Sequence, residues 1–145
     1  KGELCSKGYI VMPGYWDDKA ATDASIDAEG WMHTGDLAVM DERGYCNIVG
    51  RAKDMLIRGG ENIYPREIEE VLFQHPAIAG VQVFGVPDKK MGEEVAAWVS
   101  LREGAAQPSE DELRTFCRER LAQLKVPRYW KVVTEFQMTV TGKRQ

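Results

Sequence analysis

The first residue of chemical interest is a single carboxylate that directly follows a glycine. Asp36 comes after Gly35 within residues 31–37 (WMHTGDL), where a strand is expected to begin. A carboxylate at that point can accept hydrogen bonds from two hydroxyl groups of one ligand, and such charge-assisted bonds are the stronger kind. The same pattern also fits an Asx turn at the end of a loop. Residues 31–37 taken alone therefore predict either a hydroxyl-binding site or a turn.

A second stretch, residues 50–65 (GRAKDMLIRGGENIYP), combines charges with a pair of glycines. Arg51 and Lys53 precede the pair Gly59–Gly60, and a helix is expected to begin at Pro65. Because glycine has no side chain, such a pair lets the backbone approach a ligand closely. An ordinary turn would contain the same two glycines. This stretch alone leaves the two interpretations open.

The third stretch, residues 139–143 (TVTGK), ends in Lys143. A lysine that follows a glycine in a polar loop can present a point charge to a phosphate or carboxylate oxygen. A solvated lysine near a chain end is the commoner case for any single lysine. This stretch alone therefore predicts an anion contact or a solvated side chain.

The elements that must position these residues are sparse in the first part of the chain. Residues 9–12 are strand-like, and residues 17–30 are polar and rich in turn formers. Two short strands are expected at 37–40 and 45–49, joined by a glycine-containing hairpin loop at 41–44. About fifty residues bury too little apolar surface to form a domain alone.

The second part of the chain has a more regular order of elements. Pro65 is expected at the first position of a helix that ends at His75. Ser109 and Glu112, three residues apart, form a capping box that opens a second helix. The expected strands lie at 81–86, 95–101 and 131–136. The order helix, strand, strand, helix, strand predicts a compact α+β domain from about residue 55 to the end.

The composition excludes several classes of protein. The 145 residues suffice for one ordinary domain or slightly more, and 43% hydrophobic with 29% charged residues indicate a globular chain. No apolar run approaches the roughly 20 residues that span a membrane, and the first residues do not form a signal peptide. A net charge of −4 disfavours a nucleic-acid partner. Three separated cysteines without a CxxC pair disfavour disulfides and zinc, and predict a cytoplasmic location.

Taken in order and at their spacing, these stretches resemble the C-terminal part of the adenylate-forming enzymes, the superfamily of acyl-CoA synthetases, amino-acid adenylation domains and luciferases. The resemblance covers essentially the whole chain. It is closest to the fatty-acyl and medium-chain acyl-CoA synthetases, through residues 58–65 (RGGENIYP), 85–88 (GVPD) and 139–143 (TVTGK). It implies an α+β fold with a short sheet packed against helices, preceded by a β-rich remnant of a larger domain.

The resemblance also implies a reaction. Enzymes of this family use ATP to convert a carboxylic acid into an acyl-adenylate, and then transfer the acyl group to the thiol of coenzyme A, leaving AMP. The expected ligands are therefore the acid, ATP or AMP, and coenzyme A, with Mg²⁺ held by a residue that precedes Lys1. No metal ligand is expected within the chain itself. A small C-terminal domain rotates between the two half-reactions.

Individual roles follow from the matching positions for the nucleotide and the hinge. The resemblance implies that Asp36 binds the ribose hydroxyls and that Arg51 makes a second contact to the nucleotide. Lys53 corresponds to the hinge whose backbone torsions change when the small domain swings. Lys143 corresponds to the lysine that reaches the substrate carboxylate and the α-phosphate, where a fixed cation stabilises the charge developing between two anionic groups.

A further set of positions is implied in coenzyme A binding. Gly59 and Gly60 match the loop that lines the pantetheine tunnel, and Met91 lies in the second segment that faces this tunnel. Lys125 and Arg128 fall in the stretch that approaches the nucleotide of coenzyme A, where positive charge suits the phosphates.

Departures from the family pattern define the expected domains. The phosphate-binding loop and the Tyr-Gly-x-Thr-Glu segment of the family are absent from these 145 residues. The chain is therefore expected to contain the end of the large N-terminal domain (1–50), a hinge (51–54) and the mobile C-terminal domain (55–145). A chain without the ATP and acyl pockets is expected to be inactive alone and to need its own N-terminal domain as a partner. Gln137 stands where relatives commonly have proline.

Two other functions remain open. One is an adenylation domain that loads a carrier protein, although residues 59–65 look more like the branch that uses coenzyme A, and no carrier domain follows. The other is a binding module for a nucleotide or coenzyme A without a catalytic role. Lys143 and Asp36 would then have no reason to occur together.

Overall fold

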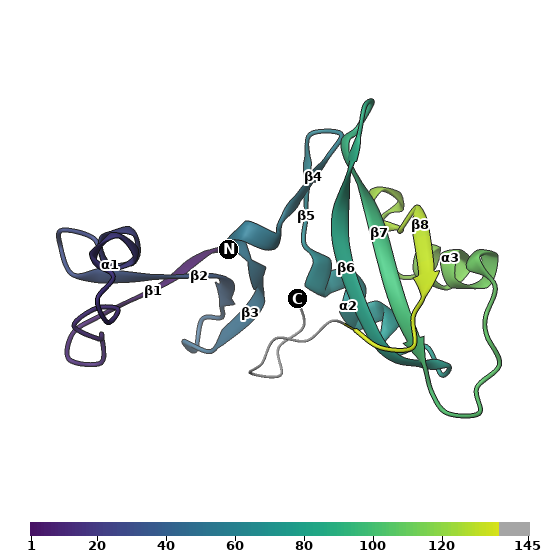
Figure 1. Cartoon of the computed structure of the whole chain (residues 1–145), viewed down its shortest axis with the longest axis horizontal. Helices are drawn as coiled ribbons and strands as arrows, with labels where there is room; N and C mark the ends of the chain where they lie inside the picture. The colour runs from purple at the N-terminus through teal and green to yellow at the C-terminus, as the bar shows by residue number, and fades with distance from the viewer. Residues whose placement is uncertain (137–145) are drawn as a thin grey trace. The chain divides into compact units, whose positions relative to one another are not determined.

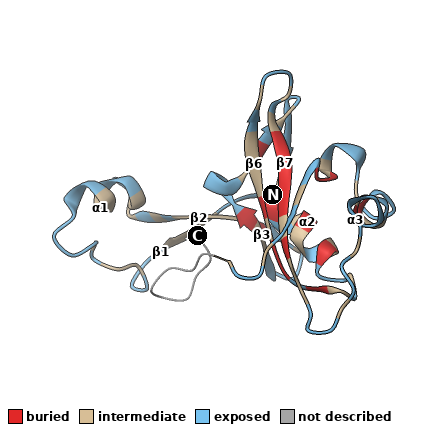
Figure 2. Cartoon of the chain, turned by 45° about the vertical axis from the view of Figure 1, so that its right-hand side comes forward, coloured by how far each residue is buried: buried red, intermediate tan, exposed pale blue. Residues whose placement is uncertain are grey.

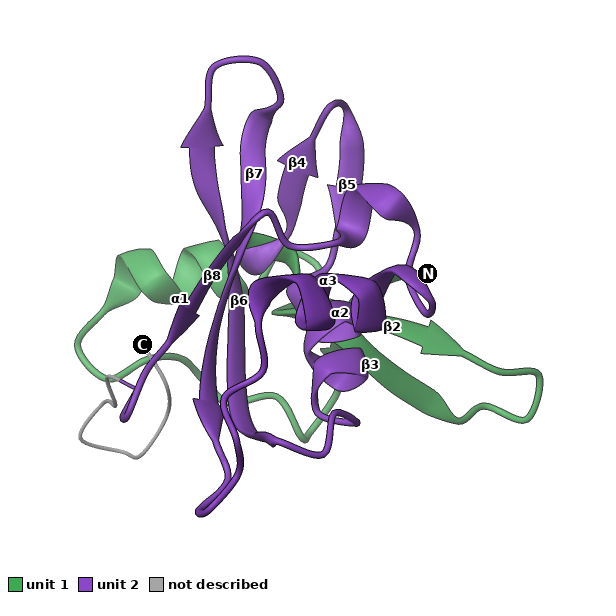
Figure 3. Ribbon diagram, turned by 90° about the vertical axis from the view of Figure 1, so that its right-hand side faces the viewer, with its two compact units in different colours: residues 1–53 green, residues 54–145 purple. Residues whose placement is uncertain are grey.

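The structure, a computed structural model, describes residues 1–136 of the chain. It divides into two compact units, residues 1–53 and residues 54–145 (Figure 3). Figure 1 labels the helices and strands of both. Within the described residues, no helix is both long enough and apolar enough to cross a membrane.

The first unit is a three-stranded antiparallel sheet with one short helix. Its elements are β1 (Gly2–Lys7), α1 (Lys19–Ser25), β2 (Trp31–Met40) and β3 (Cys46–Arg51), and the strand order is β1-β2-β3. The predicted hairpin is confirmed, because β2 and β3 pair around a turn in which Asp41 accepts hydrogen bonds from the backbone N–H groups of Arg43 and Tyr45.

Three expectations for this unit were wrong. The first strand is β1 rather than residues 9–12, which lie in turns and bends. The polar residues 17–30 include α1, whose N-terminus is capped by the Asp18 side chain at 2.8 Å from the Ala21 N–H. Strand β2 begins at Trp31, so Asp36 lies within a strand rather than at its start. In each case the local residue pattern is weak, and pairing with a distant strand or a single cap decides the conformation.

The second unit has a five-stranded sheet covered by two helices. A 3₁₀ turn (Ala52–Asp54) precedes β4 (Leu56–Arg58) and β5 (Glu61–Ile63), which are followed by α2 (Pro65–Leu72), β6 (Ile78–Asp88) and β7 (Gly92–Leu101). Helix α3 (Glu110–Arg118), a second 3₁₀ turn (Gln123–Lys125) and β8 (Tyr129–Val132) complete the order. The sheet runs β5-β4-β7-β6, with β8 parallel to β7.

The predicted α+β class and order of elements in this unit are confirmed. Pro65 begins α2, and the capping box of α3 is formed in both directions: the Ser109 Oγ accepts from the Glu112 N–H, and a Glu112 carboxylate oxygen accepts from the Ser109 N–H at 2.7 Å. The β4–β5 hairpin was not expected as a pair of strands. Strand β8 covers residues 129–132 rather than the predicted 131–136, because its extent is set by its parallel pairing with β7.

The core of the second unit lies between the sheet and the two helices, and Figure 2 shows the buried residues along β6, β7 and α2. Alternate residues of β7, Val95, Ala97 and Val99, are fully buried and face this core. They pack in one cluster with Ile68 and Leu72 of α2 and with Leu113 and Cys117 of α3. The period-2 pattern of residues 95–101 therefore marks the core face of the strand, as expected.

Candidate functional site

The two residues expected to bind a nucleotide are brought together in the first unit. Asp36 of β2 pairs in register with Arg51 of β3. The Arg51 Nε lies 3.0 Å from a carboxylate oxygen of Asp36, and the two side chains are 49% and 36% exposed. A carboxylate that carries one arginine and remains accessible can still accept hydrogen bonds from ligand hydroxyls, because an ionised carboxylate has about four acceptor positions. The geometry therefore fits a ribose contact.

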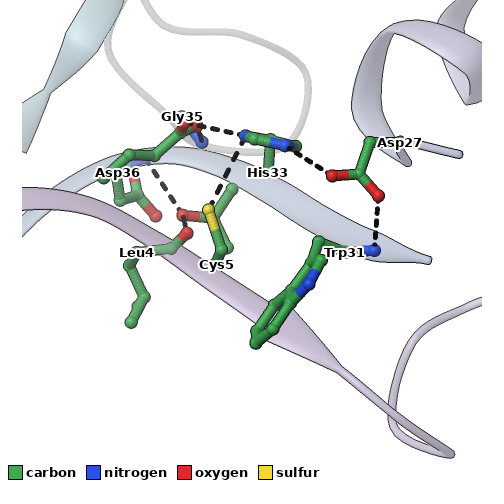
Figure 4. A network of polar contacts seen from close by, with 9 residues as sticks. Leu4, Cys5, Asp27, Trp31, His33, Gly35 and Asp36 are labelled. Carbon is green, nitrogen blue, oxygen red and sulfur yellow. Dashed lines mark hydrogen bonds and ion pairs between the residues drawn. The ribbon is translucent and has the colours of Figure 1, made fainter. Parts of the chain in front are cut away.

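The backbone before Asp36 is held by strand β1. The Thr34 hydroxyl donates to the carbonyl of Leu4 at 2.7 Å and accepts from the Asp36 N–H at 3.1 Å. A carboxylate oxygen of Glu3 accepts from the Gly35 N–H at 2.9 Å. Gly35 has φ +72°, a left-handed conformation that a side chain disfavours. These contacts, part of the network in Figure 4, fix the direction in which Asp36 leaves the strand.

The expected hinge residue lies at the end of the first unit. Lys53 is the last residue of unit 1 and belongs to the exposed 3₁₀ turn Ala52–Asp54. A short exposed turn can absorb a change in backbone torsions without disturbing a core. The position is therefore compatible with the predicted role.

The glycine pair has an immediate structural explanation. Gly59 and Gly60 join β4 to β5, with φ values of +59° and +87°. Two consecutive positive φ angles in a two-residue connection define the type of tight hairpin turn for which glycine is strongly preferred. The ordinary-turn interpretation thus accounts for both residues, and a ligand role needs support beyond the pair itself.

Met91 lies directly over this turn. The Gly59 N–H donates to the Met91 carbonyl at 2.9 Å, and a Cβ at Gly59 would lie 2.7 Å from the terminal methyl carbon of Met91. The turn that carries Met91 is held by Asp88, which accepts the N–H groups of Lys90 and Met91 at 2.8 Å each. These two backbone hydrogen bonds hold the pKa of Asp88 below its usual value. Three of the residues expected at the pantetheine tunnel therefore meet at one place.

The other two residues expected to bind coenzyme A, Lys125 and Arg128, differ in how far their side chains are exposed. Arg128 is 55% exposed and pairs with Glu94 at 3.2 Å, which raises its pKa and leaves most of the guanidinium accessible. Lys125 is 29% exposed, and its ammonium lies 2.6 Å from a carboxylate oxygen of Glu67 in α2. Both cations are paired with an acid, but Arg128 is the better placed of the two for a phosphate because its side chain is the more exposed.

Sequence reasoning missed the residue that connects these groups. Glu94 in β7 is only 2% exposed, and its carboxylate pairs with Arg58 at 2.7 Å and with Arg128 at 3.2 Å. Arg58, which directly precedes the glycine turn, also donates to the carbonyl of Leu124. Glu94 therefore ties the glycine hairpin to residues 124–128. No local signal identifies it, because its arginine partners, Arg58 and Arg128, are distant in the sequence and reach it only through the folded sheet.

The remaining expected site residue, Lys143, lies outside the described residues, as does Gln137. A shallow hollow beside α3, lined by His75, Phe116 and three acids among other residues, contains none of the expected site residues. The structure thus brings Asp36 and Arg51 together in the first unit, and Gly59, Gly60 and Met91 together in the second. Lys53 and Lys125 lie outside these two groups.

The geometry alone does not name a class of protein, but comparison with known proteins does. Residues 67–143, more than half of the chain, match the AMP-binding enzyme C-terminal domain family. The chain belongs to this family.

Its relatives are acyl-CoA synthetases and ligases. The chain is 59% identical over 145 residues to YngI of Bacillus subtilis, provisionally described as an acyl-CoA synthetase, and 50% identical to the mitochondrial medium-chain acyl-CoA ligase ACSF2 of Bos taurus. These matches cover 100% and 99% of the chain but only 26% and 23% of the relatives. The chain therefore spans about a quarter of the length of its curated relatives.

Solved structures agree over the same extent. The o-succinylbenzoate CoA synthetase of Bacillus subtilis, in complex with its acyl-adenylate intermediate, has a TM-score of 0.90 at 39% identity and matches 99% of this chain with 29% of its own. The amide bond synthetase of Marinactinospora thermotolerans has a TM-score of 0.90 at 36% identity, again over 99% of this chain and 29% of the other.

Proposed function

We propose that the chain is the C-terminal part of an ATP-dependent acyl-CoA synthetase that acts on a fatty acid. In the first half-reaction the acid attacks the α-phosphate of ATP, which forms the acyl-adenylate and releases pyrophosphate. In the second, the thiol of coenzyme A attacks the acyl carbonyl, which forms the thioester and releases AMP. The observation that carries the proposal is the gathering of the expected residues into two groups, at Asp36 and at the Gly59–Gly60 turn.

Each group has a distinct role in this proposal. Asp36 accepts the ribose hydroxyls and Arg51 holds that carboxylate in place while contacting the nucleotide. The Gly59–Gly60 turn and Met91 line the path of the pantetheine arm, and Arg128 meets a phosphate of coenzyme A. Arg58 and Glu94 act as positioning residues, because they fix the turn relative to the segment that carries Arg128.

The proposal assigns adenylation to Lys143 and the change between half-reactions to Lys53. Residues 1–50 are then the end of a larger N-terminal domain, residues 51–54 the hinge and residues 55–145 the mobile domain. The ATP and acyl pockets and the magnesium ligand belong to the preceding part of the enzyme. The 145-residue chain is consequently inactive by itself, and the compartment in which it works remains the cytoplasm predicted above.

A chimera tests the proposal directly. The 145 matching residues of the Bacillus subtilis relative are replaced by this chain, and acid-dependent release of pyrophosphate is followed over short, medium and long fatty acids, with and without coenzyme A. We expect release that requires a fatty acid, acyl-CoA as the product, and a loss of at least about 100-fold in Lys143→Ala. The unmodified relative is the positive control, and circular dichroism checks that each protein is folded. A folded chimera that forms no adenylate with any acid contradicts the proposal.

The hinge assignment has its own test in the same chimera. Lys53→Pro restricts φ at residue 53, and we expect it to spare one half-reaction while lowering the other by at least about 10-fold. Single-turnover measurements separate adenylate formation from thioester formation. The control variant is Arg66→Ala, on the exposed face of α2, because it lies outside the 3₁₀ turn that contains Lys53. Equal loss of both steps in Lys53→Pro would contradict the assignment.

A different acyl acceptor is the second candidate. The similarity to an amide bond synthetase at a TM-score of 0.90 supports an enzyme that forms the adenylate and transfers the acyl group to an amine. Loading of a carrier protein belongs to the same alternative. Adenylate formation without a thioester product in the chimera assay would favour this candidate.

A further inference from the structure

The second cluster of reactive side chains lies on strands β1 and β2 of the first unit, beside the Thr34–Asp36 segment (Figure 4). Cys5 of β1 pairs in register with His33 of β2, and Glu3 lies two residues before Cys5 on β1. The Glu3 carboxylate, the Cys5 thiol and the His33 imidazole each offer one donor atom, and these three atoms all lie within 4.8 Å of one another. Such a set can hold one metal ion.

The orientation of the imidazole is the second observation. His33 Nε2 faces a carboxylate oxygen of Asp27 at 3.5 Å. The other oxygen of Asp27 accepts the N–H groups of Glu29 and Trp31 at 2.9 Å each, which fixes this carboxylate. Nε2 can therefore direct its hydrogen at Asp27, so that the lone pair of Nδ1 points toward Glu3 and Cys5. A carboxylate behind a histidine in this way is the usual support of a metal-bound imidazole.

Three electron-pair donors then converge on one point. His33 Nδ1 lies 2.9 Å from a carboxylate oxygen of Glu3 and 3.6 Å from the Cys5 Sγ. The 2.9 Å contact is a hydrogen bond between the imidazole and Glu3, and a metal ion bound here would take the place of its proton. A tetrahedral zinc ion would separate nitrogen from oxygen by about 3.3 Å and nitrogen from sulfur by about 3.5 Å, given its ordinary bond lengths. The Glu3 oxygen and the Cys5 Sγ lie within 4.8 Å of each other, so these partly exposed side chains must also rotate to bring both donors onto one ion.

We propose that Glu3, Cys5 and His33 bind one zinc ion, with Asp27 as the residue that orients His33. The fourth position of the tetrahedron is open to water, since His33 is 42% and Glu3 34% exposed. A set with one sulfur and one imidazole nitrogen selects Zn²⁺ over Mg²⁺ and Ca²⁺, which prefer oxygen ligands. The site is thus separate from the Mg²⁺ expected with ATP, and it does not depend on the proposed function.

The other oxygen of Glu3 accepts the Gly35 N–H. A metal at Glu3 therefore ties β1 to the segment that carries Asp36. The spacing of the cysteines could not reveal this site, because its ligands come from two strands that lie 28 residues apart in the chain.

Metal binding to the chimera described above, in which the first unit is joined to a complete N-terminal domain, tests the proposal without any assay of activity. The protein is stripped with a chelator, and Zn²⁺ is titrated in competition with a chromogenic chelator. Cobalt(II) is then substituted, because a cobalt–thiolate bond gives a charge-transfer absorption in the near ultraviolet. We expect one equivalent of Zn²⁺ and a thiolate band with cobalt, whereas a tenfold excess of Mg²⁺ displaces neither metal.

The chain contains matched control residues for this test. Cys5→Ser should abolish the cobalt band, His33→Gln should weaken Zn²⁺ binding by at least about 10-fold, and Asp27→Asn should weaken it by about 10- to 100-fold while the band remains. Cys46→Ser and His75→Gln, at the exposed cysteine of β3 and the other histidine, should leave binding and band unchanged. Circular dichroism confirms that each variant is folded. Absence of stoichiometric binding, a band that survives in Cys5→Ser, or a band that disappears in Cys46→Ser would each overturn the proposal.

Discussion

Each of the two units of this chain is stabilised internally by a different kind of interaction. The second unit buries apolar side chains from both helices and the sheet in one cluster. In the first unit, Ala38 is the one buried apolar side chain, whereas Tyr9 and Trp16 are 101% and 96% exposed. A three-stranded sheet with so little burial relies on its hydrogen bonds, each of which contributes about 0.5–1.5 kcal/mol.

This difference supports the proposed division of labour. The second unit has the core of an independent domain, so it can move as a rigid body and present the glycine turn in a fixed geometry. The first unit has exposed aromatic side chains and buries almost no apolar side chain, as expected of a segment that completes a larger domain. Its rigid part is the polar network around Thr34–Asp36, where the nucleotide contact is proposed.

Truncation of a large apolar side chain should show the largest difference in stability between the two units. Leu72→Ala in the fully buried face of α2 should lower the free energy of unfolding by about 2–5 kcal/mol, because it leaves a cavity. Trp16→Ala in the first unit should change it by less than about 0.5 kcal/mol, because the side chain is exposed. Urea unfolding followed by circular dichroism measures both. Similar losses in the two variants would contradict the comparison.

Loss of the buried carboxylate in the second unit should have the next largest effect. Glu94→Gln leaves Arg58, whose side chain is 13% exposed, without its charged partner, and we expect a loss of about 3 kcal/mol. The control is Glu70→Gln, which breaks an exposed ion pair with Arg66 in α2 and should cost less than about 1 kcal/mol.

The chimera distinguishes a positioning role of Glu94 from a merely structural one. We expect Glu94→Gln to raise the KM for coenzyme A by about 10-fold, with the rate of adenylate formation unchanged. Equal loss of both half-reactions would indicate that Glu94 only stabilises the fold.

The capping box of α3 should contribute less to the free energy of unfolding than Leu72 or Glu94, and this contribution should depend on pH. Ser109→Ala removes the N-cap and should cost about 1 kcal/mol at pH 7. Hydrogen bonds from the Ser109 N–H and hydroxyl hold the pKa of Glu112 below its usual value of 4.5. A depressed folded-state pKa gives stability that is present above pH 4.5 and is lost as the pH falls through the folded-state value. The difference between wild type and variant should therefore narrow below pH 4.5, as thermal unfolding at pH 3 and pH 7 would show; a constant difference would argue against this linkage.

The rates at which the cysteines react with a thiol reagent should show the same difference in burial between the two units, without any mutation. Cys46 in the first unit is exposed, whereas Cys117 in the core of the second is fully buried, and burial raises the pKa of its thiol to about 11. At pH 8 an aromatic disulfide reagent should label Cys46 rapidly and Cys117 only when the second unit unfolds. Cys5 should react more slowly than Cys46, because partial burial and the charges of Glu3 and Asp27 raise the pKa of its thiol. Rapid labelling of Cys117 in the native protein would show that the core opens.

Local patterns were enough to predict much of the second unit. The capping box at Ser109, the start of α2 at Pro65 and the core face of β7 were predicted correctly, because a cap, a restricted φ angle and a period of two act within a few residues. The pairing of β4 with β5 was missed, since strands of three residues give almost no periodic signal.

The sequence by itself determined the family, the α+β class and the residues expected at the site, because short motifs preserve their order and spacing along the chain. Only the tertiary structure decided that Asp36 meets Arg51 across two strands and that Met91 lies over the glycine turn. It also revealed that Glu94 is buried between two arginines and that Glu3, Cys5 and His33 converge. These contacts join residues that are 15 to 36 positions apart, and the pairing of strands, which no local pattern encodes, is what brings them together.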